Sequence, residues 1–382
     1  MEKTTRKTLS EFAIEIEKDV QYEGLSEQDL INKWTSKILS LSNEFRKDNA
    51  KLTFKELYLE TMLAIAKPSN ESVLFSAIPT GFMDLDRILK GMPKGELIVI
   101  GARPAMGKTA FMVSIMANLI ESKRPIAYFS IENSAQQILL RLISFFMELP
   151  VHLIASKKNT PSQIEEILFR TKAIGEANIT IEDNCFSIDD IISQVDYLVK
   201  EKKIELVFID YLQLIKVKSR RENNREADIS KVCRELKALA RKYNIAVVVS
   251  SQLSRAVETR GGDKRPQLSD LRESGAIEQD ADKVLFIHRP EYYNITEDEY
   301  GTDTRGMAEI IIAKNREGVV DSAKLNFIGN CTKFQDLDLL TLRKQQYGAE
   351  YFKEIRKDEF KDSIDKIVRG SKMNDIEEDN PF

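Results

Sequence analysis

The most constraining feature of the sequence is a short loop between an apolar run and a helix-like stretch. The run Glu96–Ile100 (ELIVI) has the composition of a buried strand, and Thr109–Ile120 shows the apolar spacing of a helix. The joining loop ends in Gly107, Lys108 and Thr109. In such a turn, backbone N–H groups and the positive end of the helix hold phosphates, the lysine reaches the terminal phosphates, and the threonine hydroxyl coordinates magnesium. The sequence therefore predicts a nucleotide-binding loop in an α/β fold.

One position departs from the usual pattern of this loop. The pattern G-x-x-x-x-G-K-[ST] has a glycine where this chain has Ala102, and Gly101 is displaced by one position. Because GKT and the strand-loop-helix setting are intact, we expect nucleotide binding; a coincidental strand-to-helix turn is the alternative. The residues expected to bind the nucleotide are Gly101, Ala102, Arg103, Pro104, Ala105, Met106, Gly107, Lys108 and Thr109.

From Ile78 onward, short apolar runs alternate with helix-like stretches. This alternation is typical of a mainly parallel sheet flanked by helices. The other expected strands are Ile126–Ser130, Leu206–Ile209, Ala246–Ser250 and Val284–Ile287, with a hairpin of Ala308–Ala313 and Ala323–Phe327 around Glu317 and Gly318. The other expected helices are Ala135–Met147, Pro161–Lys172, Ile188–Glu201 and Arg225–Tyr243.

Composition excludes several classes of protein. The three cysteines are far apart and odd in number, which argues against a disulfide framework and a thiolate zinc site. Two histidines, His152 and His288, cannot build a His-rich metal site. Because there is no apolar run of about 18 residues and no secretory signal, we expect a soluble, cytoplasmic protein with no membrane contact. The formal charge of -4 means that any polyanion must be bound by local clusters.

Two carboxylates follow predicted strands of the sheet. Asp210 ends the run IELVFID and is expected to orient magnesium through its water shell, although a strand-end aspartate can also be a helix cap. Glu132 follows the run Ile126–Ile131, at the sheet edge where ligands of α/β proteins gather. It is a candidate general base for an attacking water. The alternative for Glu132 is an acid that stabilises a helix N-terminus.

A series of short motifs then occurs along the chain in a fixed order. They are IPTGFMDLD, GARPAMGKTAF, FSIENS, VFIDYLQLI, SSQLSR, LSDLRESGAIEQDAD and IIIAKNREG. In these motifs the chain resembles the RecA-like motor of bacterial replicative helicases, the DnaB family, from about Ile78 to Phe334. The resemblance implies a RecA-like P-loop NTPase core that uses ATP and Mg²⁺. It also implies a ring-shaped homo-hexamer that binds ATP between subunits, translocates on single-stranded DNA and unwinds forked duplex DNA.

The resemblance also assigns catalytic roles to single residues. Lys108 and Thr109 would hold phosphate and magnesium, Glu132 would activate water, and Asp210 would support the metal. Gln252, after the strand AVVVSSQ, matches a position that senses the γ-phosphate or the activated water. Lys314 and Arg316 match cationic residues that are presented to the nucleotide of the neighbouring subunit. Such an arginine makes hydrolysis depend on assembly; an ordinary solvated hairpin turn is the alternative reading of these two residues.

The DNA-binding residues implied by the resemblance lie in the loop Ser269–Gly275. Arg272 and the backbone at Gly275 are the expected contacts to successive phosphates, and Glu273 would link adjacent subunits. The stretches Arg255–Arg265 and Lys216–Arg225 add local positive charge. Contacts to phosphates without contacts to base edges imply salt-sensitive binding with little sequence preference.

The N-terminal region is shorter than the family leads one to expect. We predict a helical remnant over residues 1–52, a linker helix and linker over 53–77, an ATPase and helicase domain over 78–345, and a charged helix with an acidic, disordered tail over 346–382. The linker helix of relatives packs against the adjacent motor. The short arm puts a primase-binding collar in doubt, so a loader, a primase or other replication proteins are open as partners, and a phage, plasmid or mobile-element helicase is as plausible as a host enzyme.

Two alternatives to a helicase follow from the same residues. A RecA-like recombinase would share the ATPase site, but the linker helix and the DLRESG loop argue against it. A nucleotide-gated ring scaffold on DNA would have no need for Glu132, Asp210 and Arg316 together. The C-terminal NDIEEDNPF resembles the acidic tip with which bacterial single-strand-binding proteins recruit partners; a solubilising tail is the alternative.

Overall fold

The structure of the chain is a computed structural model. It describes residues 77–156, 159–217, 225–271, 275–297 and 301–337, together with isolated positions between Glu15 and Met62. The chain divides into two compact units, Met1–Leu74 and Phe75–Phe382, and every element discussed below belongs to the second. Apart from those isolated positions and residue 77, the predictions for residues 1–52, 53–77 and 346–382 lie outside the described residues.

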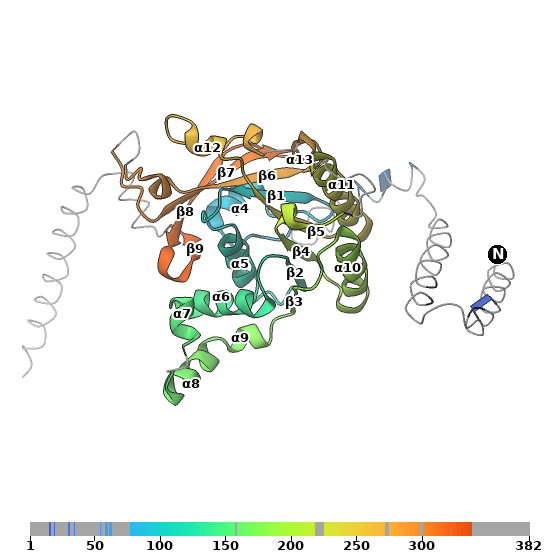
Figure 1. The fold of residues 1–382 in the computed structure, drawn as a ribbon, viewed down its shortest axis with the longest axis horizontal. Helices are drawn as coiled ribbons and strands as arrows, with labels where there is room; N and C mark the ends of the chain where they lie inside the picture. Colours follow the sequence, from blue (N-terminus) through green and yellow to red (C-terminus); the bar gives the residue numbers. More distant parts are fainter. Residues whose placement is uncertain are drawn as a thin grey trace, which may run out of the picture. The chain divides into compact units, whose positions relative to one another are not determined.

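The described strands form one nine-stranded sheet (Figure 1). The strand order is β3-β2-β4-β5-β1-β6-β7-β8-β9; the strands from β3 to β6 pair in parallel, and β6 to β9 pair antiparallel. This arrangement confirms the predicted mainly parallel α/β sheet. The strands are β1 (Leu97–Ala102), β2 (Ile126–Ser130), β3 (Ile179–Glu182), β4 (Leu206–Asp210), β5 (Ala246–Gln252), β6 (Lys283–His288), β7 (Met307–Asn315), β8 (Ser322–Ile328) and β9 (Lys333–Asp336).

Helices cover both faces of the sheet. The α-helices are α4 (Met83–Leu89), α5 (Lys108–Asn118), α6 (Ala135–Met147), α7 (Val151–Ile154), α8 (Pro161–Arg170), α9 (Lys172–Gly175), α10 (Ile188–Lys202), α11 (Arg225–Tyr243), α12 (Ala256–Thr259) and α13 (Gly275–Asp280). Short 3-10 turns are η2 (Leu212–Leu214), η3 (Leu268–Asp270), η4 (Pro290–Tyr293) and η5 (Gly329–Cys331). Within the described residues, no helix combines the length and the apolar composition needed to span a bilayer.

The core is divided into two layers by the alternation of side chains along the strands. In β1, Ile98 and Ile100 pack with α4, α5 and α6, whereas Leu97 and Val99 pack with α10 and α11. Successive side chains of a strand point to opposite faces, so a strand that is apolar at every position is buried on both. This burial explains why the central strands read as continuous apolar runs.

Three parts of the fold differ from the predicted elements. Strands β3 (ITIE) and β9 (KFQD) are not predicted from the sequence, because both mix polar and apolar residues and lie at the two ends of the sheet. The predicted helix Pro161–Lys172 is confirmed as α8 up to Arg170, but its last two residues lie outside α8, because Thr171 separates α8 from α9. The Thr171 hydroxyl donates to the Ile167 carbonyl at 2.6 Å and competes with the helical backbone bonds. The hairpin of β7 and β8 around Glu317 and Gly318 is confirmed.

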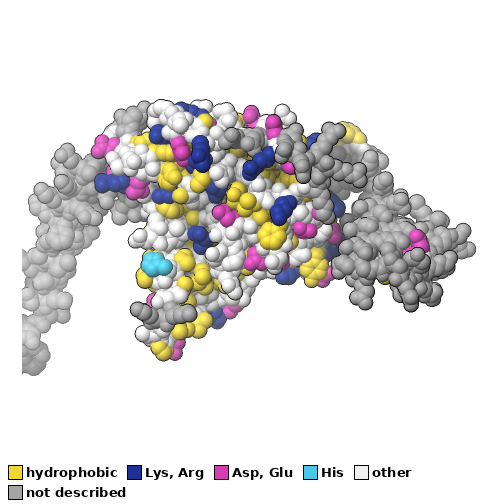
Figure 2. All heavy atoms as spheres, in the orientation of Figure 1, with side chains coloured by type: hydrophobic (Ala, Val, Ile, Leu, Met, Phe, Trp, Pro, Cys, Tyr) yellow, Lys and Arg dark blue, Asp and Glu magenta, His cyan; other side chains and the backbone are white. Residues whose placement is uncertain are grey.

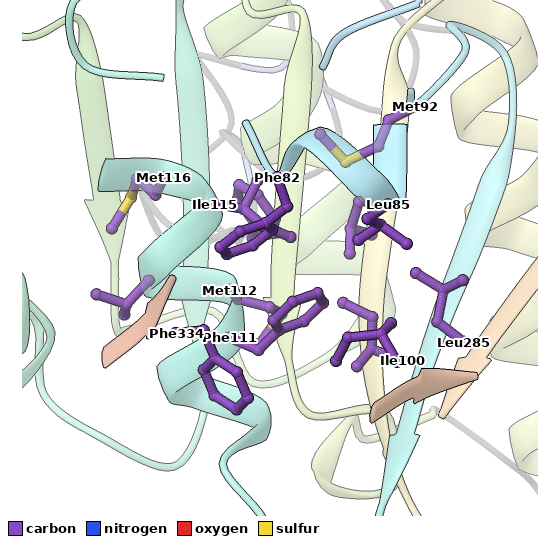
Figure 3. Packing of buried hydrophobic residues seen from close by; sticks show 14 of the residues in the cluster. Phe82, Leu85, Met92, Ile100, Phe111, Met112, Ile115, Met116, Leu285 and Phe334 are labelled. Atoms are coloured by element: carbon purple, nitrogen blue, oxygen red, sulfur yellow. The ribbon is translucent and has the colours of Figure 1, made fainter. Parts of the chain in front are cut away.

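Strand β9 closes the core over the helix that follows the nucleotide-binding loop. Phe334 is fully buried, and its ring centroid lies 5.3 Å from that of Phe111 and 4.8 Å from that of Phe327. Figure 3 shows Phe334 next to Phe111 of α5. Phe82 stacks on Phe111, with the two ring centroids 5.5 Å apart. The Phe334 N–H also donates to the Ser114 hydroxyl at 3.1 Å. The last described strand therefore fixes α5, and with it the loop.

Replacing Phe334 with alanine is expected to lower the free energy of unfolding by about 3–5 kcal/mol, because a fully buried phenyl ring is removed from a close-packed core. Urea denaturation followed by circular dichroism measures the change. Val319→Ala is the control, because Val319 is 63% exposed and its loss should cost less than about 0.5 kcal/mol. Equal stability of the two variants would contradict this view of β9.

Candidate nucleotide-binding site

The predicted phosphate-binding loop lies between β1 and α5. All six residues of β1 are buried, and α5 begins at Lys108 with Gly107 as its N-cap. Gly107 has φ = 104°, a backbone conformation that residues other than glycine rarely adopt. A Cβ atom there would also lie 3.1 Å from the Phe334 ring. The glycine is therefore required by both the backbone and the packing, and the N–H groups that begin α5 face the loop.

The loop forms one wall of a cavity of about 330 Å³. Other expected site residues from separate strands reach the same cavity, so the structure brings together Pro104, Ala105, Gly107, Lys108, Thr109, Glu132 and Gln252. Gly101, Ala102, Arg103 and Met106 do not line it. The Arg103 guanidinium instead donates to the Leu253 carbonyl at 2.7 Å and to the Glu258 carboxylate at 2.8 Å. Its side chain therefore serves another part of the molecule.

Lys108 is the cation of this cavity. Burial lowers the pKa of its ammonium group, and the Asp210 and Glu132 carboxylates oppose that shift. A buried lysine next to two acids is suited to bind a polyphosphate. The negative charge of the phosphates would stabilise the ammonium group, which burial has partly removed from water. The arrangement can neutralise phosphate oxygens.

Asp210 lies at the end of β4 and is only 1% exposed. The Thr109 hydroxyl donates to it at 2.5 Å, the Ser250 hydroxyl at 2.6 Å and the Tyr128 hydroxyl at 3.2 Å. Burial raises the pKa of Tyr128 well above its usual value, and the Asp210 carboxylate adds to that effect. Asp210 is thus a satisfied buried carboxylate directed at Thr109, and it does not cap the following turn, whose N-cap is Tyr211.

Glu132 lies in the turn between β2 and α6, and its side chain is exposed at the cavity. The turn is held by the Ser130 hydroxyl, which donates to the Asn133 carbonyl at 2.6 Å. Ser134 caps α6 in a reciprocal capping box with Gln137, so Ser134 rather than Glu132 starts the helix. The carboxylate of Glu132 is left to face the cavity, where a general base for water must be.

Gln252 ends β5, beside the carboxyl ends of β1 and β4. Its backbone N–H donates to Gln213 Oε1 at 3.1 Å, and Gln213 Nε2 donates to the Ser251 hydroxyl at 2.9 Å. The carboxamide of Gln252 forms no hydrogen bond to any residue that the structure describes. Its backbone is therefore fixed while its side chain faces the cavity.

Lys314 and Arg316 do not reach the cavity of their own chain. Both side chains donate to the Gln279 carbonyl at the end of α13, and Lys314 also donates to the Glu278 carbonyl. Arg316 forms an ion pair with Asp282 at 3.3 Å and is 47% exposed. The end of β7 thus carries two held cations that remain open to solvent.

The expected DNA-binding loop is described only in part. Arg272 and Glu273 lie outside the described residues, while Gly275 begins α13 and is exposed. Before the loop, the buried Asp270 is paired with Arg260, and the Asp270 carbonyl accepts from the Ser254 N–H at 2.8 Å. Of the stretch Lys216–Arg225, only residues 216, 217 and 225 are described.

Sequence reasoning missed several residues of the cavity. Tyr211, Arg141, Phe327 and Thr332 also line it. The Arg289 guanidinium lies 3.7 Å from the centroid of the Phe327 ring and donates to the Ala105 carbonyl at 3.5 Å. Tyr211 directly follows Asp210 and could have been found from that position. The others come from distant elements and carry no motif, so only the tertiary structure reveals them.

The chain is similar to known proteins in both sequence and structure. The family model described as DnaB-like helicase C terminal domain matches residues 77–336. The replicative DNA helicase DnaB of Geobacillus stearothermophilus is 37% identical over 311 residues, which cover 81% of this chain and 67% of that protein. The probable plasmid replicative DNA helicase of Chlamydia psittaci is 41% identical over 259 residues, covering 67% of this chain and 54% of that protein.

Solved structures show the same similarity. A structure of a DnaB-like replicative helicase and its interactions with primase superimposes with a TM-score of 0.72 at 29% identity, covering 88% of this chain and 77% of that chain. A second solved structure, that of an ATPase domain, gives a TM-score of 0.67 at 32% identity, covering 75% of this chain and 100% of that one.

Proposed function

The chain belongs to the DnaB-like family of replicative DNA helicases, which are ATP-hydrolysing enzymes, and on that premise we propose that it works as a homo-hexameric ring that moves along single-stranded DNA. The contact between Thr109 and Asp210 supports this proposal most directly. It joins the phosphate-binding helix to the buried strand-end acid, and Thr109 itself lines the cavity together with Lys108 and Glu132. A loop that only recognised phosphate would need neither acid.

The donor set at Thr109 and Asp210 fits Mg²⁺. A hydroxyl and a buried carboxylate are hard oxygen ligands, and one or two of them plus substrate phosphates is the usual protein contribution to a magnesium site. Thr109 would bind the ion directly and Asp210 through water. When bound, the ion neutralises charge on the phosphate oxygens.

Hydrolysis at this site divides among the chain's own residues. Glu132 takes a proton from a water molecule as that water attacks the γ-phosphorus; the new P–O bond forms while the bond to the β-phosphate oxygen breaks, and ADP leaves. Lys108 holds the terminal phosphates, and Gln252 contacts the γ-phosphate or the attacking water. Phe327, which lines the cavity, and Arg289, which stacks on it, are proposed to form an apolar and cationic surface for the base.

Lys314 and Arg316 complete the site of the adjacent subunit. They are far enough from their own cavity not to line it, yet they are held in place and half-exposed. A cation that enters from a neighbour stabilises charge in the transition state and makes hydrolysis depend on assembly.

The ring would assemble through apolar surfaces on both units. Several side chains of the α6 to α8 region are exposed, namely Leu139, Leu149, Leu153, Ile164, Leu168 and Phe169. Within the predicted linker helix, Phe54, Tyr58, Leu59 and Met62 are exposed as well. Exposed apolar surface of this kind marks a protein interface. Each set is proposed to lie at a contact with a neighbouring subunit, and the proposed domains are the motor over residues 78–345, the helical remnant over 1–52 and the charged tail over 346–382.

DNA and replication proteins are the proposed partners. The proposed contacts to successive phosphates of one strand are Arg272 and the backbone at Gly275, Glu273 is the proposed link between adjacent subunits, and forked duplex is the proposed substrate. The structural neighbour whose description names interactions with primase makes a primase a partner to test, next to a loader. A replicative enzyme of this kind acts in the cytoplasm, where its DNA template is.

ATP-dependent displacement of a strand from a forked duplex tests the function. The full chain is expected to release the strand with ATP and Mg²⁺ and to fail without either, because unwinding is driven by hydrolysis. A strand-exchange assay in parallel detects a recombinase. Hydrolysis that single-stranded DNA stimulates, with no displacement of the strand, would instead indicate a ring scaffold.

A further inference from the structure

A second cavity lies next to the nucleotide site. It has a volume of about 340 Å³ and is lined at the end of β5 by Gln252, Leu253, Ser254 and Arg255, with Arg103, Tyr211, Gln213 and Arg225 from other elements. The lining residues come from the phosphate-binding loop, the segment after β4, the start of α11, and the end of β5 with the segment that follows it. This size is in the range of small-ligand sites. We refer to it below as the arginine pocket.

The charge of the arginine pocket has one sign. Arg103, Arg225 and Arg255 line it, and none of its described lining residues is acidic. Over the face drawn in Figure 2, in contrast, acidic and basic side chains are interspersed, and the chain as a whole has a formal charge of -4. Three arginines around one cavity are therefore a local feature and do not follow from the overall composition.

The three arginines are held in different ways. Arg103 is 6% exposed and is fixed by the Leu253 carbonyl and by Glu258, so its charge is balanced by a carboxylate outside the lining. Arg255 is exposed and forms no ion pair with any residue in the described part of the chain. Arg225 is the first residue of the 19-residue helix α11, where a cation opposes the helix dipole. An anion in the pocket would be favourable to Arg255 and to that dipole.

The arginine pocket shares a wall with the nucleotide cavity. Tyr211 and Gln252 line both. Gln213 fixes this wall, because it accepts from the Gln252 N–H at 3.1 Å and donates to the Ser251 hydroxyl at 2.9 Å. Burial raises the pKa of Tyr211, and the Glu132 carboxylate adds to that shift, which is consistent with a phenol that stays neutral between the two cavities.

We propose that the arginine pocket binds one phosphate group beside the nucleotide site. Guanidinium groups bind phosphate oxygens through paired, charge-assisted hydrogen bonds, and the lining residues that the structure describes include three arginines and no acid, which favours an anion. The group is either a backbone phosphate of single-stranded DNA, which enters past the exposed Arg225 and Arg255, or orthophosphate that leaves the nucleotide cavity past Gln252. Both sources rest on the proposed function, and the shared wall would let occupancy of one cavity alter the other.

The test uses the full chain with Arg225→Ala and Arg255→Ala, and Arg241→Ala as matched control. Arg241 is an exposed arginine in the last turn of the same helix, far from the pocket. Binding of a fluorescent oligo-dT strand is measured against salt concentration. A lost phosphate contact should weaken binding about tenfold and reduce the slope of log K against log salt by about 0.7. Inhibition of ATP hydrolysis by added orthophosphate is measured on the same samples.

The two measurements distinguish a DNA phosphate from orthophosphate as the occupant of the pocket. If DNA occupies the pocket, both pocket variants lose oligo-dT affinity and slope relative to Arg241→Ala. If orthophosphate occupies it, the inhibitory concentration of orthophosphate rises about tenfold in both variants while oligo-dT binding is unchanged. Pocket variants that match Arg241→Ala in both measurements overturn the proposal. Strand displacement by the unmodified chain is recorded alongside, so that failure of the helicase assignment is seen separately from failure of the pocket.

Discussion

Replacing Arg316 with alanine is expected to reduce the kcat of ATP hydrolysis by about 10³–10⁵-fold while ATP binding changes little. The effect arises because the guanidinium is proposed to reach the transferring phosphate of the neighbouring subunit, where charge develops only in the transition state. The protein should still fold, because Asp282, which pairs with Arg316, keeps its ion pair with Lys237 at 2.5 Å and its bond from the Leu97 N–H at 2.7 Å.

Mixing two inactive variants distinguishes action across a subunit boundary from action within one chain. Arg316→Ala subunits retain an intact Lys108, and Lys108→Ala subunits retain an intact Arg316. A ring that contains both has some boundaries with Lys108 on one side and Arg316 on the other, so hydrolysis should partly recover on mixing. The steady-state ATPase rate measures it, and the native mass with and without ATP reports the ring.

Arg305→Ala is the control for loss of an exposed arginine. Arg305 pairs with Asp303 at 2.8 Å, is 67% exposed and does not line the nucleotide cavity, so its replacement should leave kcat within a factor of two or so. Full activity of Arg316→Ala, or equal rates for dilute protomers and assembled rings, would show that one chain contains a complete site.

The central fold could be predicted because burial on both faces leaves a simple pattern. Strands β2, β4, β5 and β6 are buried at nearly every position, contain an apolar run of at least four residues and stand close to the expected bounds. The strands at the two ends of the sheet are different. β3 is half-buried throughout, and β9 has only Phe334 fully buried among Lys333, Gln335 and Asp336. Where a strand buries a single residue, no periodic signal exists, and its place is fixed by tertiary contacts.

The residues of the nucleotide site likewise include some that the sequence predicts and some that it does not. Lys108 and Thr109 follow from a local pattern, and Glu132, Asp210 and Gln252 could be placed together because β2, β4 and β5 are parallel and their carboxyl ends meet at one edge. Phe327 and Thr332 reach the cavity from the antiparallel part of the sheet, which no motif connects to the loop. For Arg103 the motif is misleading. Its position in the loop suggests phosphate binding, but its side chain is bound to Glu258.

Glu132→Gln is expected to lower the kcat of ATP hydrolysis by about 10²–10⁴-fold and to leave ATP affinity nearly unchanged. The amide has the size of the carboxylate, so the cavity keeps its shape, but it cannot accept the proton of the attacking water. The turn should also survive, because the Ser130–Asn133 bond and the capping box of Ser134 do not involve the Glu132 side chain.

Single-turnover hydrolysis and equilibrium binding of ATP together separate this role from a structural one. A residue that only maintained the cavity would change affinity as well as rate, whereas a general base changes the rate alone. Glu201→Gln is the control, since Glu201 is exposed on α10 and does not line the cavity. Because the variant should bind ATP without cleaving it, it should also hold oligo-dT in the ATP state and fail to displace a strand. Hydrolysis at the normal rate by Glu132→Gln would show that Glu132 is not the general base. The attacking water would then need a base from elsewhere, because Glu132 is the one carboxylate among the described residues that line the cavity.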